Sequence, residues 1–326
     1  MGISERIDIA VVGTGVMGTN HLRVLSRMSE AQLIGVVDTD LDRAQVAADS
    51  ANTHCFQSLE ELITAFGSTE GQKAAVVTTP TSSHLSVATA LAKEGIHILV
   101  EKPVASTIAE ATELKETTEK AEVLSMVGHI ERFNPVVVEV LRPGYQDVLH
   151  LDIRRIGPFS ARVLDNVIDD LMIHDLDIAR QIARSPLVDV RAIARVERSS
   201  TYDMATALLT FESGITASLT ASRLGQKKVR SLELTLESAV VSGDLLHQTV
   251  AVHRSESTGV TPDGTHRHAQ TSAEELPFLT GRAEPLAEEL GAFLGAIRNE
   301  KTSPIPLDEG IEAMHMAKAV HSALTS

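Results

Sequence analysis

Three side chains in this sequence have the chemistry and the context to move a proton at a substrate oxygen. Asp170 and His174 are four residues apart, so a helix would carry them on one face. A histidine suits the role of general base, because its unperturbed pKa lies near ~6.5. Lys102 stands between Glu101 and Pro103 at the end of an expected strand, where its ammonium group can reach a substrate. Taken alone, each of these features has a structural alternative, which is a solvated helix face for Asp170 and His174 and a surface ion pair for Lys102.

A glycine-rich turn near the start of the chain predicts a dinucleotide site. Residues 13–18 have the spacing G-x-G-x-x-G, after an expected strand and before an expected helix, where a pyrophosphate can approach the backbone. The next expected strand ends at Asp38, 38 − 18 = 20 residues further on, where a carboxylate binds ribose hydroxyls and repels a 2′-phosphate. No arginine follows Asp38 directly, so the sequence favours NAD over NADP; the alternative is a turn without a ligand. The residues predicted to bind the cofactor here are Gly13, Gly15, Val16, Met17, Gly18 and Asp38.

A dense polar string and a group of carboxylates offer two further candidates. Residues 128–135 follow the last expected strand of the first domain and place His129 and Arg132 where a substrate cleft is expected; the alternative is a hinge turn with surface charges. Asp169, Asp170 and Asp175 crowd together, but no second histidine stands at metal-ligand spacing. We therefore predict no metal site.

The composition excludes several classes of partner. With 29 Lys+Arg and 44 Asp+Glu, the net charge of −15 argues against nucleic acid and anionic membrane surfaces, which require basic patches. Only 3% of the residues are aromatic, and Cys55 is the single cysteine, so no intrachain disulfide can form. Cys55 lies near a short expected strand, and we expect it to be a small residue of the core. No run of about 18 apolar residues predicts a membrane span. We expect a folded protein of a reducing compartment, located in the cytoplasm.

The candidate residues of the first domain depend on a repeated strand–helix order. Short apolar runs alternate with amphipathic segments, which predicts strands at 7–12, 33–37, 74–77, 96–100 and 123–127 with helices between them. Such an order predicts a doubly wound parallel sheet, the Rossmann arrangement, with right-handed crossovers. Capping boxes are expected at Ser58 and Thr107. The predicted dinucleotide-binding domain is 1–125.

The pattern changes after residue 126 and predicts an α+β domain over 126–326, C-terminal helices included. One long helix is expected over 166–184, and alternating segments predict a large, mostly antiparallel sheet at 148–153, 188–196, 204–211, 215–223, 232–236 and 245–253. A polar stretch over 255–272 is expected to be a loop, and helices are expected at 285–298 and 308–324. One face of the segment 215–222 is apolar, whereas the other carries Thr216, Ser218, Thr220 and Ser222. We expect this open face to pack against a second copy of the chain.

In combination, these motifs resemble the glucose–fructose oxidoreductase, inositol dehydrogenase and MocA (Gfo/Idh/MocA) family of oxidoreductases. The glycine turn, Thr78-Thr79-Pro80, Glu101-Lys102-Pro103 and the Asp170/His174 helix occur in the family's order. The segments 284–286 and 306–310 resemble its C-terminal end, so the resemblance covers nearly the whole chain. It implies that Lys102, Asp170 and His174 form the catalytic centre beside the nicotinamide. It also adds to the cofactor site Thr79, Pro80, His84 and Glu101.

The string 128–135 further resembles a subgroup that includes UDP-N-acetylglucosamine 3-dehydrogenases, and Arg132 matches a substrate-contacting position of related polyol dehydrogenases. The resemblance implies an NAD-dependent dehydrogenase that oxidises a secondary alcohol of a sugar, most simply a nucleotide sugar at C3. A diphosphate would require local cations, for which the sequence offers Arg132, Arg154, Arg155 and Arg162. We expect a small-molecule carbohydrate substrate and a homodimer or homotetramer.

Two other functions stay open at this point. The substrate can be a sugar phosphate, inositol or another polyol instead of a nucleotide sugar. The chain can also be a non-catalytic dinucleotide-binding sensor, although such proteins typically lose the lysine or the histidine, and both Lys102 and His174 are present. Reductases of imines or linear tetrapyrroles usually lack the Asp/His pair.

Overall fold

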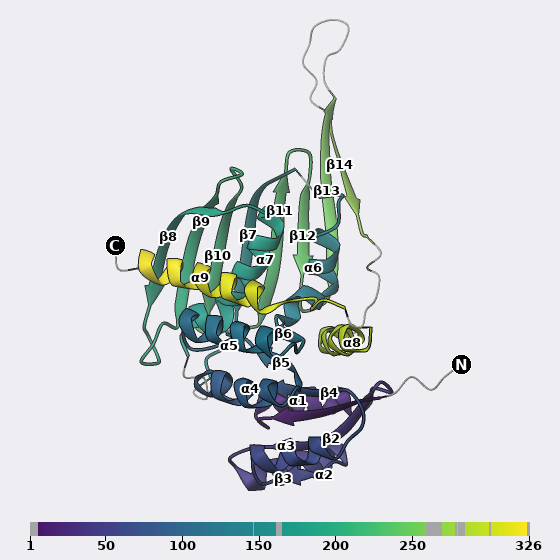
Figure 1. Ribbon diagram of the computed structural model, residues 1–326. Helices are drawn as coiled ribbons and strands as arrows, with labels where there is room; N and C mark the ends of the chain where they lie inside the picture. Colours follow the sequence, from purple (N-terminus) through teal and green to yellow (C-terminus); the bar gives the residue numbers. More distant parts are fainter. Residues whose placement is uncertain are drawn as a thin grey trace, which may run out of the picture. The chain divides into compact units, whose positions relative to one another are not determined.

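The chain divides into two compact units, and each is described by itself. The computed structural model describes residues 6–145, 147–160, 165–258, 269–277, 279, 284–299 and 301–324 (Figure 1). The first unit comprises Met1–Ile130 and Glu284–Met314, and the second comprises Glu131–Ala283 and His315–Ser326. The division differs from the expected boundary after residue 125, because residues 284–314 return to the first unit.

A six-stranded parallel sheet is the centre of the first unit. Its strand order is β3-β2-β1-β4-β5-β6, which is the order of a Rossmann fold. In the central strand β1, Ile9, Ala10 and Val11 are fully buried, as expected for a strand covered on both faces. The strands are β1 (Ile7–Val12), β2 (Ala31–Val37), β3 (Cys55–Phe56), β4 (Lys73–Val77), β5 (His97–Glu101) and β6 (Ser125–Gly128).

Polar side chains cap the N-termini of several helices of the first unit, although not all of them. The Thr107 capping box is present, with both reciprocal hydrogen bonds to Glu110. Ser58 Oγ accepts from the Glu61 amide, but the Glu61 side chain accepts from Gln57 N instead of closing the box. The helices are α1 (Val16–Leu25), α2 (Leu41–Ala51), α3 (Leu59–Gly67), α4 (His84–Lys93), α5 (Ile108–Lys120) and α8 (Pro285–Arg298), with a 3₁₀ turn at Thr81–Ser83 before α4. Helix α8, far away in sequence, packs against α1.

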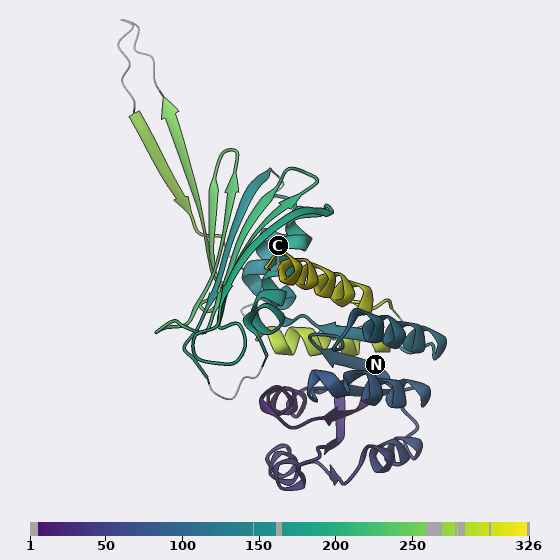
Figure 2. The ribbon, with the colours of Figure 1, turned by 90° about the vertical axis from the view of Figure 1, so that its left-hand side faces the viewer.

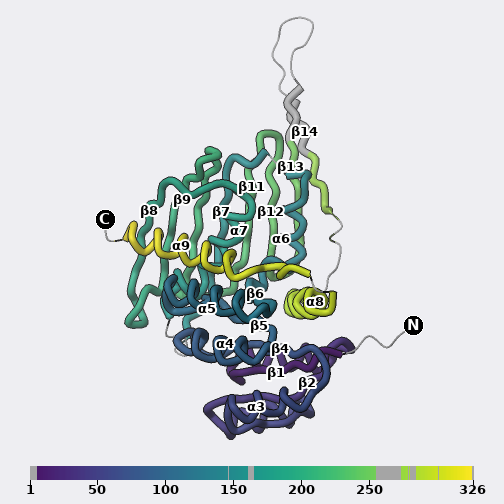
Figure 3. The backbone as a smooth tube through the Cα atoms, in the orientation of Figure 1, coloured from purple at the N-terminus to yellow at the C-terminus, as the bar shows by residue number. Residues whose placement is uncertain are grey.

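The second unit is built on an eight-stranded sheet whose order is β14-β13-β12-β11-β7-β10-β9-β8. All of its neighbouring strands are antiparallel except β10 and β7. Strands β13 and β14 form one edge of the sheet (Figure 3). The strands are β7 (Val148–Ile156), β8 (Leu187–Arg195), β9 (Met204–Phe211), β10 (Thr216–Ser222), β11 (Val229–Leu236), β12 (Val240–Asp244), β13 (Thr249–Thr258) and β14 (Ala269–Glu275). The predicted fold class is thereby confirmed for both units.

Helices of the second unit cover one face of this sheet and leave the other face open (Figure 2). They are α6 (Pro135–Val140), a π-helical turn at Ile168–Met172 that continues as α7 (Ile173–Ala183), and the last turns of α9 (Leu307–Ala323). Their apolar residues join the buried sheet face in one core, to which Ile168, Met172 and Leu176 contribute with no exposed surface. Burial of such side chains stabilises the fold by about 1.5–3 kcal/mol each. Ala217, Leu219 and Ala221 face this core, as the alternation in β10 predicts.

Three local predictions are wrong. The stretch 255–272 contains the end of β13 and the start of β14, while its middle, including His266 and His268, lies outside the described residues. The expected segment 245–253 is the turn after β12 and the start of β13, and β12 itself, with the apolar pair Val240 and Val241, was missed. Cys55 is half-buried at the end strand β3 instead of lying in the core. Within the described residues, no helix is long and apolar enough to cross a membrane.

Candidate functional site

The glycine turn packs so closely on its neighbours that two of its glycines cannot carry a side chain. Gly13 has a positive φ of +98°, and a Cβ there would lie 2.7 Å from the Thr78 backbone. A Cβ at Gly18 would lie 1.9 Å from the Gly13 carbonyl oxygen. Thr78 Oγ1 also donates to this oxygen at 2.6 Å. The turn therefore depends on backbone-to-backbone contact between the ends of β1 and β4.

Gly15 differs, because a Cβ there would meet no protein atom within 4 Å. It is the N-cap of α1, and no side chain caps the first amides of this helix. Val16, the first helical residue, is 76% exposed, while Met17 is half-buried. Open backbone amides at a helix N-terminus suit an anion, so this turn fits the pyrophosphate of NAD.

Asp38 ends β2 as expected, but protein donors already surround its buried carboxylate. Oδ2 accepts from Thr14 N at 2.6 Å and from Thr14 Oγ1 at 2.8 Å, and Oδ1 accepts from Asp40 N at 2.9 Å. Arg43 donates to both oxygens, with Nη2 2.6 Å from Oδ1 and Nε 3.3 Å from Oδ2. Burial opposes ionisation of Asp38, but these hydrogen bonds outweigh it and lower its pKa to about 2. The site holds a carboxylate at neutral pH.

Arg43 is a residue that the sequence reasoning missed. The search for a basic residue covered only the positions directly after Asp38, whereas Arg43 lies one turn into α2. Its side chain is 49% exposed, so it is the donor that can move away when ribose hydroxyls approach Asp38. The sequence signal that could have found it is the spacing of five residues from Asp38 to Arg43. This spacing places Arg43 in the first turn of α2, close to the end of β2.

The loop after β4 is held by His84. Its ring nitrogens lie 2.9 Å from the carbonyl oxygens of Thr79 and Pro103, so the histidine joins the loops that follow β4 and β5. Pro80 precedes the 3₁₀ turn that leads into α4. Thr79 Oγ1 is buried and has no hydrogen-bond partner among the described residues, which fits a polar group of a bound ligand. His84 thus shapes the predicted cofactor site through these loops.

Glu101 and Lys102 lie at the carboxyl end of β5. Glu101 is buried, and its Oε1 accepts from His21 Nε2 of α1 at 2.8 Å. Lys102 is half-buried, and the peptide bond to Pro103 is cis. The first unit therefore gathers the glycine turn, Asp38, the His84 loop and Lys102 at the carboxyl ends of its strands, where ligands bind in open α/β sheets.

In the second unit, Asp170 lies in the π-helical turn and His174 in the first turn of α7. The sequence predicted one regular helix; a π turn is wider than an α turn and often occurs at functional sites. Asp170 Oδ2 accepts from Arg223 Nη2 at 2.7 Å, and Arg223 Nη1 also donates to the Asp165 carbonyl. Arg223 follows β10 and was missed, because nothing in the sequence pairs it with a helix 53 residues away.

Two of the four arginines that the sequence offers as cations for a diphosphate pair with carboxylates in the structure. Arg132 forms a bidentate pair with the buried Asp177, with distances of 2.7 and 2.5 Å. Arg155 is buried between Asp175 and Glu131, 2.7 and 2.6 Å from their oxygens. Burial disfavours the charge of Arg155, but those two carboxylates outweigh it and raise its pKa above the usual value.

The two other arginines of that expected group are Arg154 and Arg162. Arg154 is exposed and pairs in register with Thr220, whose side chain belongs to the open sheet face. Arg162 lies outside the described residues. His129, the other predicted substrate ligand, is 1% exposed.

Each of the carboxylates considered for a metal pairs with a different basic side chain. Asp169 lies 3.0 Å from His321 Nε2 of α9, whereas Asp170 pairs with Arg223 and Asp175 with Arg155. Among the residues that the structure describes, no three His, Cys, Asp or Glu side chains are grouped to hold a metal ion.

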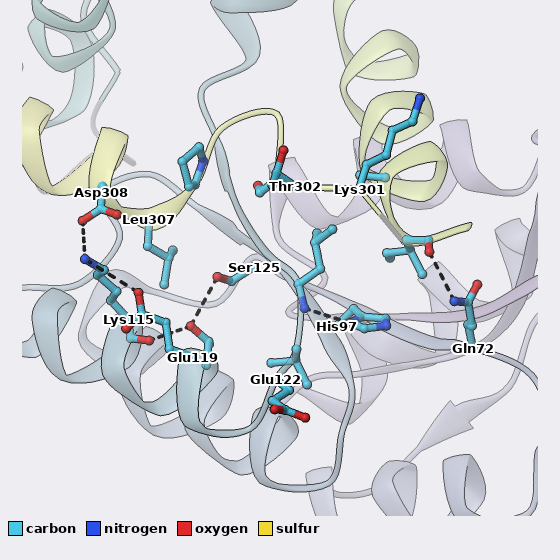
Figure 4. Close-up of a pocket in the computed structure, with 17 residues that line it drawn as sticks. Gln72, His97, Lys115, Glu119, Glu122, Ser125, Lys301, Thr302, Leu307 and Asp308 are labelled. Carbon is cyan, nitrogen blue, oxygen red and sulfur yellow. Dashed lines mark hydrogen bonds and ion pairs between the residues drawn. The ribbon is translucent and has the colours of Figure 1, made fainter. Parts of the chain in front are cut away.

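A pocket of about 600 Å³ lies at the amino ends of strands of the Rossmann sheet, opposite the ends that carry the candidate residues (Figure 4). Its lining includes His97 and Ser125, the first residues of β5 and β6, and Asp308 at the start of α9. Figure 4 shows hydrogen bonds and ion pairs among the lining residues, such as the contact of 2.6 Å between Lys115 Nζ and Asp308. None of the candidate residues above lines it.

Comparisons with known proteins agree with this arrangement. A model of the oxidoreductase family with an NAD-binding Rossmann fold matches residues 7–129. A model of the GFO/IDH/MocA C-terminal domain matches residues 160–242. The chain is 32% identical to the UDP-N-acetylglucosamine 3-dehydrogenase of Acidithiobacillus ferrooxidans over 289 residues, 88% of this chain and 87% of that one. It is 26% identical to the scyllo-inositol 2-dehydrogenase (NAD(+)) of Bacillus subtilis, over 94% of this chain and 90% of that one.

Solved structures show the same likeness in three dimensions. A structure of the UDP-N-acetylglucosamine 3-dehydrogenase from Acidithiobacillus ferrooxidans superimposes with a TM-score of 0.86 at 30% identity, covering 97% of both chains. A levoglucosan dehydrogenase in complex with NADH and levoglucosan shares the fold, with a TM-score of 0.80 at 16% identity, over 98% of this chain and 97% of that one. With both domains matched, the chain belongs to the GFO/IDH/MocA family and is an oxidoreductase that acts on CH–OH groups, with an NAD-binding Rossmann domain.

Proposed function

We propose that this oxidoreductase oxidises a nucleotide sugar, UDP-N-acetylglucosamine or a close analogue, at C3, with NAD as its cofactor. The observation that carries the proposal is the 32% identity to a UDP-N-acetylglucosamine 3-dehydrogenase along 88% of the chain. The inositol dehydrogenase that also matches supports a polyol as the alternative substrate.

The proposed mechanism assigns one task to each candidate catalytic residue. His174 removes the hydroxyl proton as general base, and the Lys102 ammonium group stabilises the alkoxide that forms. Asp170, fixed by Arg223 at 2.7 Å, orients the base or the substrate and favours the imidazolium. NAD, when bound, would accept the hydride that leaves the oxidised carbon.

The first prediction concerns these residues. Lys102→Ala and His174→Ala should each lower kcat about 10²–10⁴-fold, the range of positioned acid–base groups, with the affinity for NADH nearly unchanged. Steady-state rates and fluorescence titration of NADH measure the two effects. Lys93→Ala and His247→Ala, at exposed positions, are the matched controls. Near-normal turnover of His174→Ala would eliminate His174 as the general base.

The wild-type rate of alcohol oxidation should rise with pH, because the histidine must lose its proton to act as the base.

The second prediction concerns the choice of cofactor. Asp38 should favour NAD, because its carboxylate repels a 2′-phosphate, whereas Arg43 partly offsets that charge. Asp38→Ala should weaken NAD binding and reduce the preference for NAD over NADP. Arg43→Gln should increase that preference. Titrations with NADH and NADPH measure both. A wild type that uses NADP faster than NAD at equal low concentration contradicts the assignment.

The third prediction concerns the substrate. UDP-N-acetylglucosamine should give a kcat/KM at least tenfold above those of inositol, glucose and sugar phosphates in an assay of NADH formation. Arg132 is paired with Asp177, so we assign it to holding α7 rather than to a free cationic site. Efficient oxidation of inositol or glucose, equal to that of any nucleotide sugar, would defeat the nucleotide-sugar proposal and leave the dehydrogenase in place.

The fourth prediction concerns assembly through the open sheet face of the second unit. Besides its small polar side chains, this face exposes Ile193 and Leu208, which are 70% and 53% exposed. We propose that a second copy of the chain covers them in a homodimer or homotetramer. Light scattering at micromolar concentration should show an oligomer, and Leu208→Lys should shift it toward monomer, whereas Leu246→Lys in the turn after β12 should not. A monomeric wild type would end this proposal. The expected cytoplasmic location stays a prediction.

A further inference from the structure

Three buried ionisable side chains lie on elements of the first unit that contact one another, and one of them directly precedes Lys102. His21 of α1 and Glu289 of α8 have no exposed surface, and Glu101 at the end of β5 is 7% exposed. None of these three has a task in the mechanism proposed above. Such a concentration of buried ionisable groups is costly unless each is paired or neutral.

Two of the three groups form a pair, and the third does not. His21 Nε2 donates to Glu101 Oε1 at 2.8 Å, and the Lys102 amide lies 3.3 Å from Oε2. A Cβ on Gly128 would lie 3.1 Å from the same Oε2, so this oxygen is also closely packed. In contrast, neither carboxyl oxygen of Glu289 has a hydrogen-bond partner among the described residues.

The two carboxyl groups have opposite protonation preferences. Burial opposes ionisation of Glu101, but the hydrogen bond and charge of His21, with the charge of Lys102, outweigh it and lower its pKa. Burial, with the nearby charge of Glu101, raises the pKa of Glu289 well above its usual value. Environments that push the pKa values of two neighbouring carboxyl groups apart in this way are typical of functional sites.

The other charged groups around the cluster come from several elements. The negative charge of Glu101 also acts on the ring of His84 in α4. On α8 itself, Glu284 pairs with Arg23 at the surface and Glu288 is exposed. Within the described part of the chain, Glu101 is the charge that acts on Glu289. A leucine would fill this position of α8 without a desolvation penalty, so a buried, unpaired carboxyl there points to a role beyond packing.

We propose that Glu289 is a positioning residue for the dehydrogenase reaction: it stays protonated, leaves Glu101 as the single carboxylate charge behind Lys102, and through Glu101 fixes the orientation of Lys102. A neutral Glu289 adds no second negative charge to the region in which Glu101 accepts from His21 Nε2 and from the Lys102 amide. The link to catalysis rests on the proposed role of Lys102, whereas the protonation state of Glu289 does not.

The first experiment needs neither cofactor nor substrate. The melting temperature of the full chain is compared with that of Glu289→Gln, which mimics the neutral acid, from pH 4.5 to 8.5. The folded wild type keeps a proton that the unfolded chain releases above about pH 4.5, so its stability falls as pH rises. The melting temperature of Glu289→Gln should therefore equal that of wild type at pH 4.5. Above that pH it should exceed the wild-type value by on the order of 2 °C per pH unit.

The control is Glu288→Gln, a neighbouring exposed glutamate on the same helix. It should show no such trend. In a Glu101→Gln background the gain from Glu289→Gln should shrink, because the like charge is removed. A Glu289→Gln variant that is less stable than wild type, with a gap that widens as pH rises, shows an ionised and stabilising Glu289 and overturns the proposal.

The second experiment separates positioning from structure. Glu289→Leu should be at least as stable as wild type at pH 7, yet its kcat should fall tenfold or more, with the KM for NAD within about twofold. Glu289→Gln should restore kcat. Covalent amine labelling of Lys102, compared with the exposed Lys93 by mass spectrometry, follows the same orientation without turnover. The Lys102 labelling rate should change at least twofold in Glu289→Leu and not in Glu289→Gln.

Each failure has a separate meaning. A stable Glu289→Leu variant with wild-type kcat and unchanged labelling overturns the positioning role. If even the wild type oxidises no sugar, the proposed function fails, while the melting and labelling comparisons still decide the role of Glu289.

Discussion

The first unit depends on one close contact, the backbone of the glycine turn against the backbone after β4. Gly13 and Gly18 are the residues that allow it, since a Cβ at either would overlap neighbouring main-chain atoms. The contact fixes the start of α1, and with it the open amides at Gly15 and the side chain of His21. From there His21 reaches Glu101, so the position of α1 affects both the cofactor turn and the residue before Lys102.

The second unit uses charge pairing for the same purpose. Four carboxylates along the π turn and α7 pair with separate basic side chains from α9, from the residue after β10, from β7 and from the segment before α6. These carboxylates are, in the same order, Asp169, Asp170, Asp175 and Asp177. Because most of these groups are largely buried, loss of one partner would leave an uncompensated charge at a cost of about 3–5 kcal/mol. The pairs therefore connect α7, which carries His174, to β7 and to the segment before α6.

Local patterns in the sequence were sufficient to predict most elements and the cofactor turn. The apolar run 7–12, the capping residues and the spacing from Gly18 to Asp38 act over short distances, and the structure agrees with them. Strand β12 was missed because only four residues separate it from β13, so no clear break in the alternating pattern marks it as a strand of its own. The π turn was missed because it changes the hydrogen bonding of the helix but not its apolar period.

The site was harder to predict, because its partners come from distant parts of the chain. Arg132 has the sequence context of a substrate ligand, and only the fold shows that Asp177 neutralises it. Glu289 stands in an ordinary amphipathic helix, and its burial beside Glu101 depends on α8 returning to the first unit. Arg223 and Asp170 are 53 residues apart. Ion pairs of this kind leave no periodic signal.

The most direct test of the central claim is to locate the hydrogen that is transferred. The protein is incubated with NAD and UDP-N-acetylglucosamine carrying deuterium at C3, and the reduced cofactor is analysed by mass spectrometry. A C3 dehydrogenase should produce NADH with one deuterium atom, together with a ketone at C3 of the sugar. Unlabelled NADH, or a nucleotide sugar that keeps its deuterium while inositol or a sugar phosphate is oxidised, would contradict the account.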